Sequence, residues 1–233
     1  MLQVLKSSQR GSADHGWLRS NHSFSFGHYY NPNEMGFGPL LVINEDRVQP
    51  SRGFGTHSHD NMEIISYVLS GALEHKDSMG NGSVIRYGDV QRMSAGTGVQ
   101  HSEFNHSSTE RVHFLQIWIT PNVTDIEPGY EEKHFDTASK TGCLRLIASA
   151  DGQDGSVLIH QDAKVFASIL NNDDHVEYEL APTRTAYVHL IRGKAEINGI
   201  QLSTGDALKV SEESLVEFKN AADAELLLFD LPY

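Results

Sequence analysis

Two short segments of the sequence carry closely spaced residues that can bind a metal ion. The first runs Gly-Phe-Gly-Thr-His-Ser-His at residues 53–59 and places His57 two positions before His59; in the second, His101 stands two positions before Glu103. Side chains two residues apart on an extended strand point to the same side. Each segment therefore offers a pair of ligand atoms on one face of a strand.

If the two segments are neighbours across a barrel, three imidazoles and one carboxylate meet at one point. Such a ligand set suits a divalent first-row transition metal, and two positions of an octahedron stay open for water, substrate or dioxygen. The chain has thirteen histidines, so paired histidines also arise by chance. The alternative interpretation is that these are solvated strand histidines.

The sequence around these residues predicts short β-strands that position them. Apolar runs bounded by turn residues occupy residues 40–44, 62–69, 84–87, 90–93 and 113–119. The Asn-Gly pair at 81–82 is typical of a hairpin, and the alternation of Phe24 with Phe26 predicts a strand with one buried face. Turns at intervals of roughly eight to twelve residues, with few helical periods, predict a sandwich or barrel.

The second half of the chain repeats the pattern of the first. Residues 67–74 resemble residues 188–196, with an offset of 122 between Gly71 and Gly193, and the Gly-Asp pair at 88–89 recurs at 205–206. A boundary is expected where Pro-Gly and a charged run fall, near residues 125–140. We therefore expect two β units, 1–130 and 131–233.

The predicted second unit lacks the metal-binding residues of the first. It has no His-x-His pair in the corresponding region, and Val-Glu-Phe-Lys at 216–219 stands in the place of His101 and Glu103. We expect this unit to pack against the first and to form a wall of its metal site, rather than to bind the same metal.

The amino-acid composition excludes some classes of binding partner and indicates the cellular compartment. Eighteen Lys and Arg against 31 Asp and Glu give a formal charge of −13, which disfavours binding to nucleic acid or to an anionic membrane surface. No stretch is long and apolar enough for a signal peptide or a membrane span. With one cysteine no internal disulfide can form, which predicts a soluble cytoplasmic protein, and the run from Cys143 to Ile147 reads as a buried strand.

These motifs resemble those of a known family. Gly53-x-Gly-x-His57-x-His59-x-x-x-Glu63, then Gly-Asp at 88–89 and His101-x-x-x-Asn105, are similar to the two motifs of the cupin superfamily. The sequences His-Ser-Phe-Ser-Phe at 22–26, Met-Ser-Ala-Gly-Thr-Gly at 93–98 and His-Ser-Glu at 101–103 look like the pirin branch of bicupins, in particular bacterial pirin-like proteins with quercetin 2,3-dioxygenase activity. The resemblance spans nearly the whole chain and is dense over about residues 10–120.

The resemblance implies an all-β bicupin, with two tandem jelly-roll barrels of which the N-terminal one binds metal. The pirin pattern implies His57, His59, His101 and Glu103 as ligands, whereas the general cupin pattern would use Glu63 instead of Glu103. Ligating histidines usually donate their other N–H to a neighbouring group, and strand parity makes Asn105, Gln116, His75 and His113 candidates for that role. Ser58 stands where many relatives have proline.

The implied activity is cleavage of a flavonol such as quercetin with dioxygen, with Glu103 accepting the proton of the substrate hydroxyl. The cofactor would be one divalent transition metal ion, iron first, with nickel, manganese, cobalt, copper or zinc as alternatives. A second hypothesis is a metal-binding regulatory protein that acts through protein partners without turnover, and a third is another cupin chemistry such as isomerisation. A monomer is expected, because a bicupin holds in one chain what single cupins obtain by dimerising.

Overall fold

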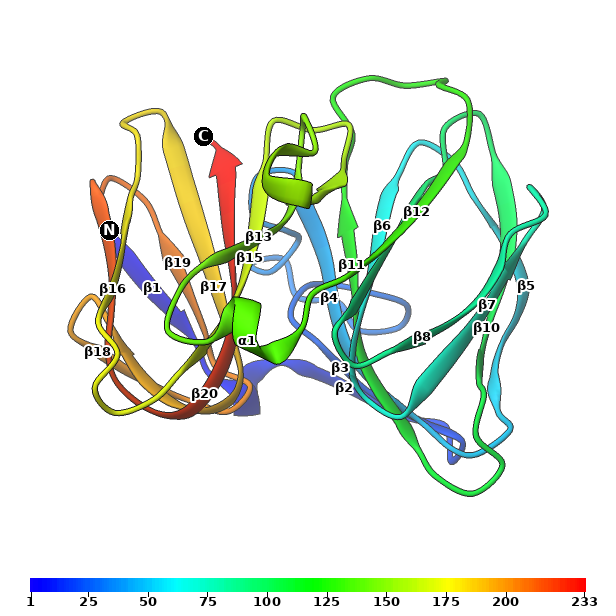
Figure 1. The fold of residues 1–233 in the computed structure, drawn as a ribbon, viewed down its shortest axis with the longest axis horizontal. Helices are drawn as coiled ribbons and strands as arrows, with labels where there is room; N and C mark the ends of the chain where they lie inside the picture. Colours follow the sequence, from blue (N-terminus) through cyan, green and yellow to red (C-terminus); the bar gives the residue numbers. More distant parts are fainter. The chain divides into compact units, whose positions relative to one another are not determined.

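The computed structural model describes residues 1–233 and is built almost entirely of strands (Figure 1). Helical structure is limited to one turn of α-helix, α1 at Thr137–Lys140, and to the 3₁₀ turns η1 at Ser7–Gln9 and η2 at Gln153–Gly155. No helix has the length and apolar character that crossing a membrane would require. The predicted all-β fold is confirmed.

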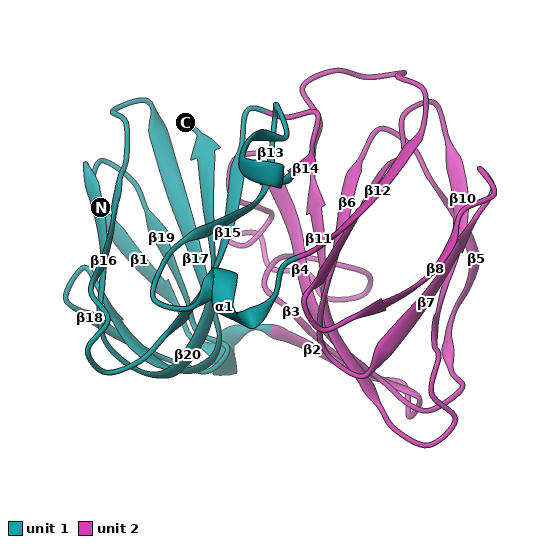
Figure 2. Ribbon diagram, in the orientation of Figure 1, with its two compact units in different colours: residues 1–10, 135–156, 162–233 teal, residues 11–134, 157–161 magenta.

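The chain forms two compact units, coloured separately in Figure 2. Unit 1 comprises residues 1–10, 135–156 and 162–233, and unit 2 comprises residues 11–134 and 157–161. The first ten residues belong to unit 1 because their strand β1, Leu2–Leu5, pairs with β19, Ala207–Val210. The expected division after residue 130 falls inside the strand β12 of unit 2.

Unit 2 consists of two antiparallel sheets. The larger has seven strands in the order β12-β9-β6-β11-β4-β3-β2, and the smaller has four in the order β5-β10-β7-β8. The strands are β2 Gly11–Asp14, β3 Leu18–His22, β4 Leu40–Val48, β5 Gly53–His59, β6 Glu63–Ser70, β7 Ala72–Asp77, β8 Gly82–Arg86, β9 Asp89–Ser94, β10 Val99–Asn105, β11 Val112–Ile119 and β12 Gly129–His134. The short strand β14, Val157–Leu158, lies in the segment 157–161. The apolar runs and the Asn-Gly hairpin, between β7 and β8, are confirmed.

Unit 1 has the strand order β1-β19-β17-β20-β15-β13, with β16 paired to β20 and β18 paired to β17. The strands not yet given are β13 Arg145–Ser149, β15 Lys164–Leu170, β16 Val176–Glu179, β17 Arg184–Ile197, β18 Ile200–Ser203 and β20 Leu215–Pro232. Its core is one cluster of aliphatic side chains with Phe218 among them. Alternate residues of each strand point inward, and their apolar side chains together fill this core.

The internal repeat has the same backbone conformation in both units. Gly71 has φ +77° and Gly193 has φ +79°, and at both a Cβ would lie within 3 Å of a backbone oxygen. The repeated aspartates accept a backbone N–H three residues back, Asp89 from Arg86 at 2.8 Å and Asp206 from Ser203 at 3.1 Å. The two glycines adopt the same backbone conformation, and the two aspartates make the same hydrogen bond in their turns. This agreement is expected for two copies of one β unit.

Replacing Gly71 by alanine is expected to lower the free energy of unfolding by about 1–3 kcal/mol, because the new Cβ combines a positive φ with a clash. The Arg111 carbonyl oxygen would lie 2.6 Å from that Cβ. Gly80 has φ +92° with open space around it. Gly80→Ala therefore measures the loss of unfolding free energy that the positive φ causes without a steric clash. Equal losses for the two variants in urea unfolding would show that the close approach at Gly71 has no energetic consequence.

Two local predictions are wrong. Residues 24–26 are not a strand: β3 ends at His22, and Phe26 forms only an isolated bridge with Tyr29. Cys143 precedes β13 and is exposed, and its thiol donates to the Ser139 carbonyl at 3.3 Å. The predicted strand at 143–147 is correct only from Arg145 onward, where β13 pairs with β15. Residues 24–26 and Cys143 have an apolar pattern typical of a strand, but they belong to no strand of a sheet.

Candidate metal centre

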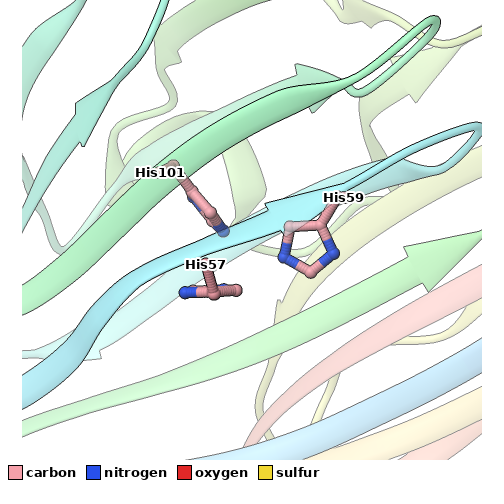
Figure 3. A group of neighbouring side chains, drawn as sticks. All are labelled: His57, His59 and His101. Carbon is pink, nitrogen blue, oxygen red and sulfur yellow. The ribbon is translucent and has the colours of Figure 1, made fainter.

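The antiparallel pairing of β5 with β10 brings the two predicted segments together. His101 lies opposite His57 in the register, and the rings of His57, His59 and His101 have centroid separations of 4.4, 4.8 and 4.9 Å. One ring nitrogen of each lies within 4.8 Å of the others, and Figure 3 shows the three rings gathered beside the paired strands. The predicted convergence of the three histidines is therefore found in the structure.

A bulge in β5 orients the first of these rings. Between His57 and Phe54 the register with β10 shifts, so that three steps on β5 match two on β10. Nδ1 of His57 lies 2.8 Å from the Gly55 carbonyl oxygen. A carbonyl only accepts, so this nitrogen carries the proton and Nε2 of His57 presents a lone pair. Bulges of this kind re-aim side chains next to functional sites.

Burial, together with the neighbouring imidazoles, keeps His59 and His101 neutral. Burial, reinforced by the charge of His57, lowers the pKa of His59 to about 4. Burial, reinforced by His57 and His59, lowers the pKa of His101 to about 3. Nε2 of His59 and both ring nitrogens of His101 are buried without a hydrogen-bond partner. Three lone pairs gathered around one point, with no protein donor to satisfy them, fit a single divalent transition metal.

Glu103 enters the same interior from β10 and is held from the opposite sheet. Its carboxylate accepts hydrogen bonds from Ser66 Oγ on β6 at 3.2 Å and from Gln116 Nε2 on β11 at 3.1 Å. The side chain is buried, and burial raises its pKa to about 7; nearby Asp46 adds to the rise, while the two hydrogen bonds oppose it. A neighbouring cation would favour its ionised form.

Glu63, the alternative carboxylate, has other partners. It is buried on β6, where one oxygen accepts from Ser94 Oγ at 2.9 Å and the other lies 3.2 Å from Nδ1 of His160. Neither the carboxylate of Glu63 nor that of Glu103 is among the ligand atoms that cluster with the three histidines. Glu63 thus links β6 to β9 and to the segment 157–161.

The four candidates for orienting the ligands behave differently. Gln116 binds Glu103, and His75 is fully buried with its ring centroid 5.3 Å from that of His101. Asn105 instead donates to the backbone carbonyls of Val48 and Glu110, which anchors a loop. His113 is half-buried and pairs with Glu45 at 3.0 Å. Strand parity identified inward-facing residues but not which of them reach the cluster.

A cleft of about 680 Å³ in unit 2 was not predicted. Aromatic side chains form much of its wall, namely Trp17, His22, Phe26, Tyr29 and Phe54. His22 is held by Asn44, 2.7 Å from its Nδ1. The wall is assembled from β2, β3, the turn between them, the loop after β3, and residues of β4 and β5, so no local pattern in the sequence could reveal it.

None of the three clustered histidines lines the cleft, but two residues of its wall, Phe54 and Phe26, connect it to the candidate metal centre. Phe54 lies opposite Glu103 in the strand register. Phe26 packs edge-on against Trp118 at 5.4 Å, and Trp118 packs edge-on against His59 at 4.9 Å. Phe26 also lines the cleft, whereas its sequence neighbour Phe24 is fully buried in the core.

A second group of ligand-type residues, His175, Glu177 and Glu217, lies on unit 1. His175 and Glu177 are exposed, and Glu217 pairs with Lys219 at 2.9 Å and with His175 at 3.0 Å. These contacts are those of a solvated ion-pair network on a surface strand.

Comparison with known proteins matches both halves of the chain. Residues 3–119 match the family model described as Pirin, and residues 146–231 match the model described as the Quercetinase C-terminal cupin domain. The chain is 45% identical over 232 residues to a quercetin 2,3-dioxygenase of Escherichia coli, covering 100% of this chain and 99% of that protein. It is 39% identical to a pirin-like protein of Caulobacter vibrioides, covering 94% and 95% of the two chains.

Solved structures agree with this assignment. The crystal structure of the bacterial pirin YhhW from Escherichia coli in complex with nickel(II) superposes with a TM-score of 0.95 at 45% identity, covering 100% of this chain and 99% of that one. The bicupin fold is therefore confirmed. With its two family-model matches, its full-length relatives and a barrel interior that gathers three histidines, the chain belongs to the pirin family.

Proposed function

We propose that the chain is a metal-dependent dioxygenase that cleaves a flavonol such as quercetin with dioxygen. The observation that carries the proposal is the cluster of three imidazoles, which is linked through Trp118 to the wall of an aromatic cleft. The names of its relatives, among them a quercetin 2,3-dioxygenase and a nickel-bound pirin, support it.

In this proposal His57, His59, His101 and Glu103 hold the metal. Glu103 supplies the carboxylate because it shares the inward face of β10 with His101, whereas Glu63 lies on β6 and contacts Ser94 and His160. Three neutral imidazoles and one carboxylate leave the ion with net positive charge, and iron, nickel, manganese, cobalt, copper and zinc all accept such ligands. Iron is the first choice. When bound, the metal supplies Lewis acidity that lowers the pKa of a coordinated hydroxyl.

The residues of the chain then have separate tasks. Glu103 accepts the proton of the substrate hydroxyl at a carboxylate oxygen, and Ser66 and Gln116 hold that oxygen in place. The resulting enolate is electron-rich enough to reduce dioxygen without an external reductant. The absence of a nucleotide-binding glycine-rich loop from the sequence is consistent with that chemistry.

The cleft is proposed to bind the aromatic part of the substrate. A volume of about 680 Å³ falls in the range of small-molecule sites, roughly 300–1,000 Å³. Trp17 and Phe54 pack edge to face at 5.3 Å and present flat apolar surface. His22 and Asp46 add polar groups to the wall that suit a polyhydroxylated ring.

The test is dioxygen consumption with quercetin by metal-free protein reconstituted separately with each candidate metal. Consumption that needs the metal and matches quercetin loss is the expected result. In Trp17→Ala, which removes one wall of the cleft, KM is expected to rise while metal content stays at one equivalent. One bound equivalent of metal without dioxygen consumption, for every metal tried, would overturn the enzyme and favour the regulatory hypothesis.

A further inference from the structure

A buried histidine and aspartate lie beside the metal centre on the neighbouring strand. His75 and Asp77 on β7 have completely buried side chains, and Nε2 of His75 lies 3.0 Å from Oδ2 of Asp77. In the register of β7 with β10, Asp77 lies opposite His101 and His75 opposite Glu103. Opposed residues of an antiparallel pair point to the same face, so both face the metal centre.

The contacts of Asp77 determine the tautomer of His75. Donors surround both oxygens of the Asp77 carboxylate: Oδ1 accepts from the backbone N–H groups of Met79 and Asn81, and Oδ2 accepts from the Asn81 side chain, which leaves no acceptor for a carboxyl proton, so the group is ionised. An ionised carboxylate can only accept. Nε2 of His75 therefore carries a proton, and when the ring carries this one proton, Nδ1 is left as a hydrogen-bond acceptor.

That acceptor has no partner in the protein. Nδ1 of His75 is buried and unpaired, as are both ring nitrogens of His101, and the two rings lie 5.3 Å apart between centroids. The ring of Tyr130 packs over His75 at 5.1 Å, but the Tyr130 hydroxyl donates to Glu132 at 2.6 Å. A metal on one nitrogen of His101 leaves an N–H on the other, and a buried N–H needs an acceptor.

Asp77 has no capacity left to serve as that acceptor directly. Its Oδ1 accepts from the backbone N–H groups of Met79 and Asn81 and from the Asn81 side chain. Its Oδ2 accepts from His75 and from the same Asn81 amide. These five contacts occupy about four lone-pair positions, so Nδ1 of His75 remains as the available acceptor.

We propose that His75 is a positioning residue for the metal centre: it accepts the N–H of His101, directly or through one water, and Asp77 fixes its tautomer. Asp77, His75 and His101 then form a hydrogen-bonded chain that ends at the metal. The inference rests on the proposed metal centre and adds to it a buried support that the ligand motifs do not contain.

The test compares Co²⁺ binding by the full-length chain with binding by His75→Phe and Asp77→Asn. Loss of such a supporting contact typically weakens metal affinity about 10–100-fold, and both variants are expected to fall in that range by competition titration. Asp77→Asn is the sharper variant, because it keeps the His75 ring but replaces an acceptor with a side chain that can donate to Nε2, which reverses the tautomer.

A spectroscopic measurement separates positioning from folding. In the Co²⁺-loaded protein, ligand histidine N–H protons give hyperfine-shifted NMR signals. One such signal is expected to exchange slowly with D₂O in the wild-type protein and to exchange rapidly or vanish in both variants. Leu73→Ala is the matched control: Leu73 is buried two residues before His75 on the same strand. This variant is expected to lower the thermal midpoint while leaving Co²⁺ affinity and the protected signal unchanged.

The outcomes are distinguishable. Unchanged Co²⁺ affinity and an unchanged protected N–H in Asp77→Asn and His75→Phe would overturn the role of His75 and leave the proposed function standing. An equal loss of affinity in Leu73→Ala would also overturn it, because general destabilisation would then explain the effect. A wild-type chain that binds no Co²⁺ would overturn the proposed function and this inference together.

Discussion

Replacing His101 by alanine is expected to lower metal affinity by more than about 100-fold, beyond the range seen when only a supporting contact is lost. Dioxygen consumption with quercetin should disappear with the metal. His101 is buried and lies against both other histidines, with ring centroids 4.4 and 4.9 Å away. Metal content after dialysis and dioxygen uptake are the two measurements.

His106→Ala is the matched control for this experiment. His106 follows β10 directly, is half exposed and pairs with Glu74 at 3.2 Å, so it lies outside the barrel interior. This variant should keep both the metal and the activity. A His101→Ala protein that still binds one equivalent of metal at wild-type affinity would contradict the assignment of the cluster.

Replacing Glu103 by glutamine is expected to reduce kcat by about 10²–10⁴-fold, the usual contribution of a general base. Glutamine keeps the shape and can still accept from Ser66, but it cannot take a proton. Glu63→Gln is the control, because Glu63 is a buried glutamate of the same barrel that contacts Ser94 and His160 instead. If Glu63→Gln lost the metal and Glu103→Gln did not, the ligand assignment would be reversed.

The same substitution should change how metal binding depends on pH. Burial raises the pKa of Glu103 to about 7 in the metal-free protein. Below pH 7 a proton therefore competes with the metal, and apparent affinity should fall about tenfold for each pH unit. In Glu103→Gln this slope should be smaller by the one proton that Glu103 no longer takes up. Equal slopes in the two proteins would exclude Glu103 as the competing group.

The raised pKa of Glu103 also affects the stability of the metal-free protein. The folded state holds this proton more tightly than the unfolded chain, so the stabilising contribution is complete below pH 4.5, the ordinary pKa of a glutamate, and is lost as the pH rises through about 7. Metal-free Glu103→Gln should therefore match the wild type near pH 4 and exceed it in unfolding free energy at pH 8. Urea unfolding at the two pH values measures the difference.

The amino-acid sequence by itself determined the fold class and the three clustered histidines. Strand periodicity is a local property, so the spacing of His57 with His59, and of His101 with Glu103, is enough to assign each pair to one face of a strand. The repeat of Gly71 at Gly193 was visible for the same kind of reason: a backbone oxygen lies too close for any other side chain. The family resemblance then supplied the ligand pattern, with Glu63 left as the alternative.

Tertiary structure decided what depends on residues distant in sequence. Only the pairing of β7 with β10 shows that His75 and Asp77 lie beside His101, and only the packing of β6 and β11 shows what holds Glu103. The aromatic cleft combines residues 12–29 with Asn44, Asp46 and Phe54, and one partner of Glu63 is His160. Phe24 with Phe26, and Cys143, were misassigned because a β-strand requires a partner strand, and the identity of that partner is a long-range property of the folded chain.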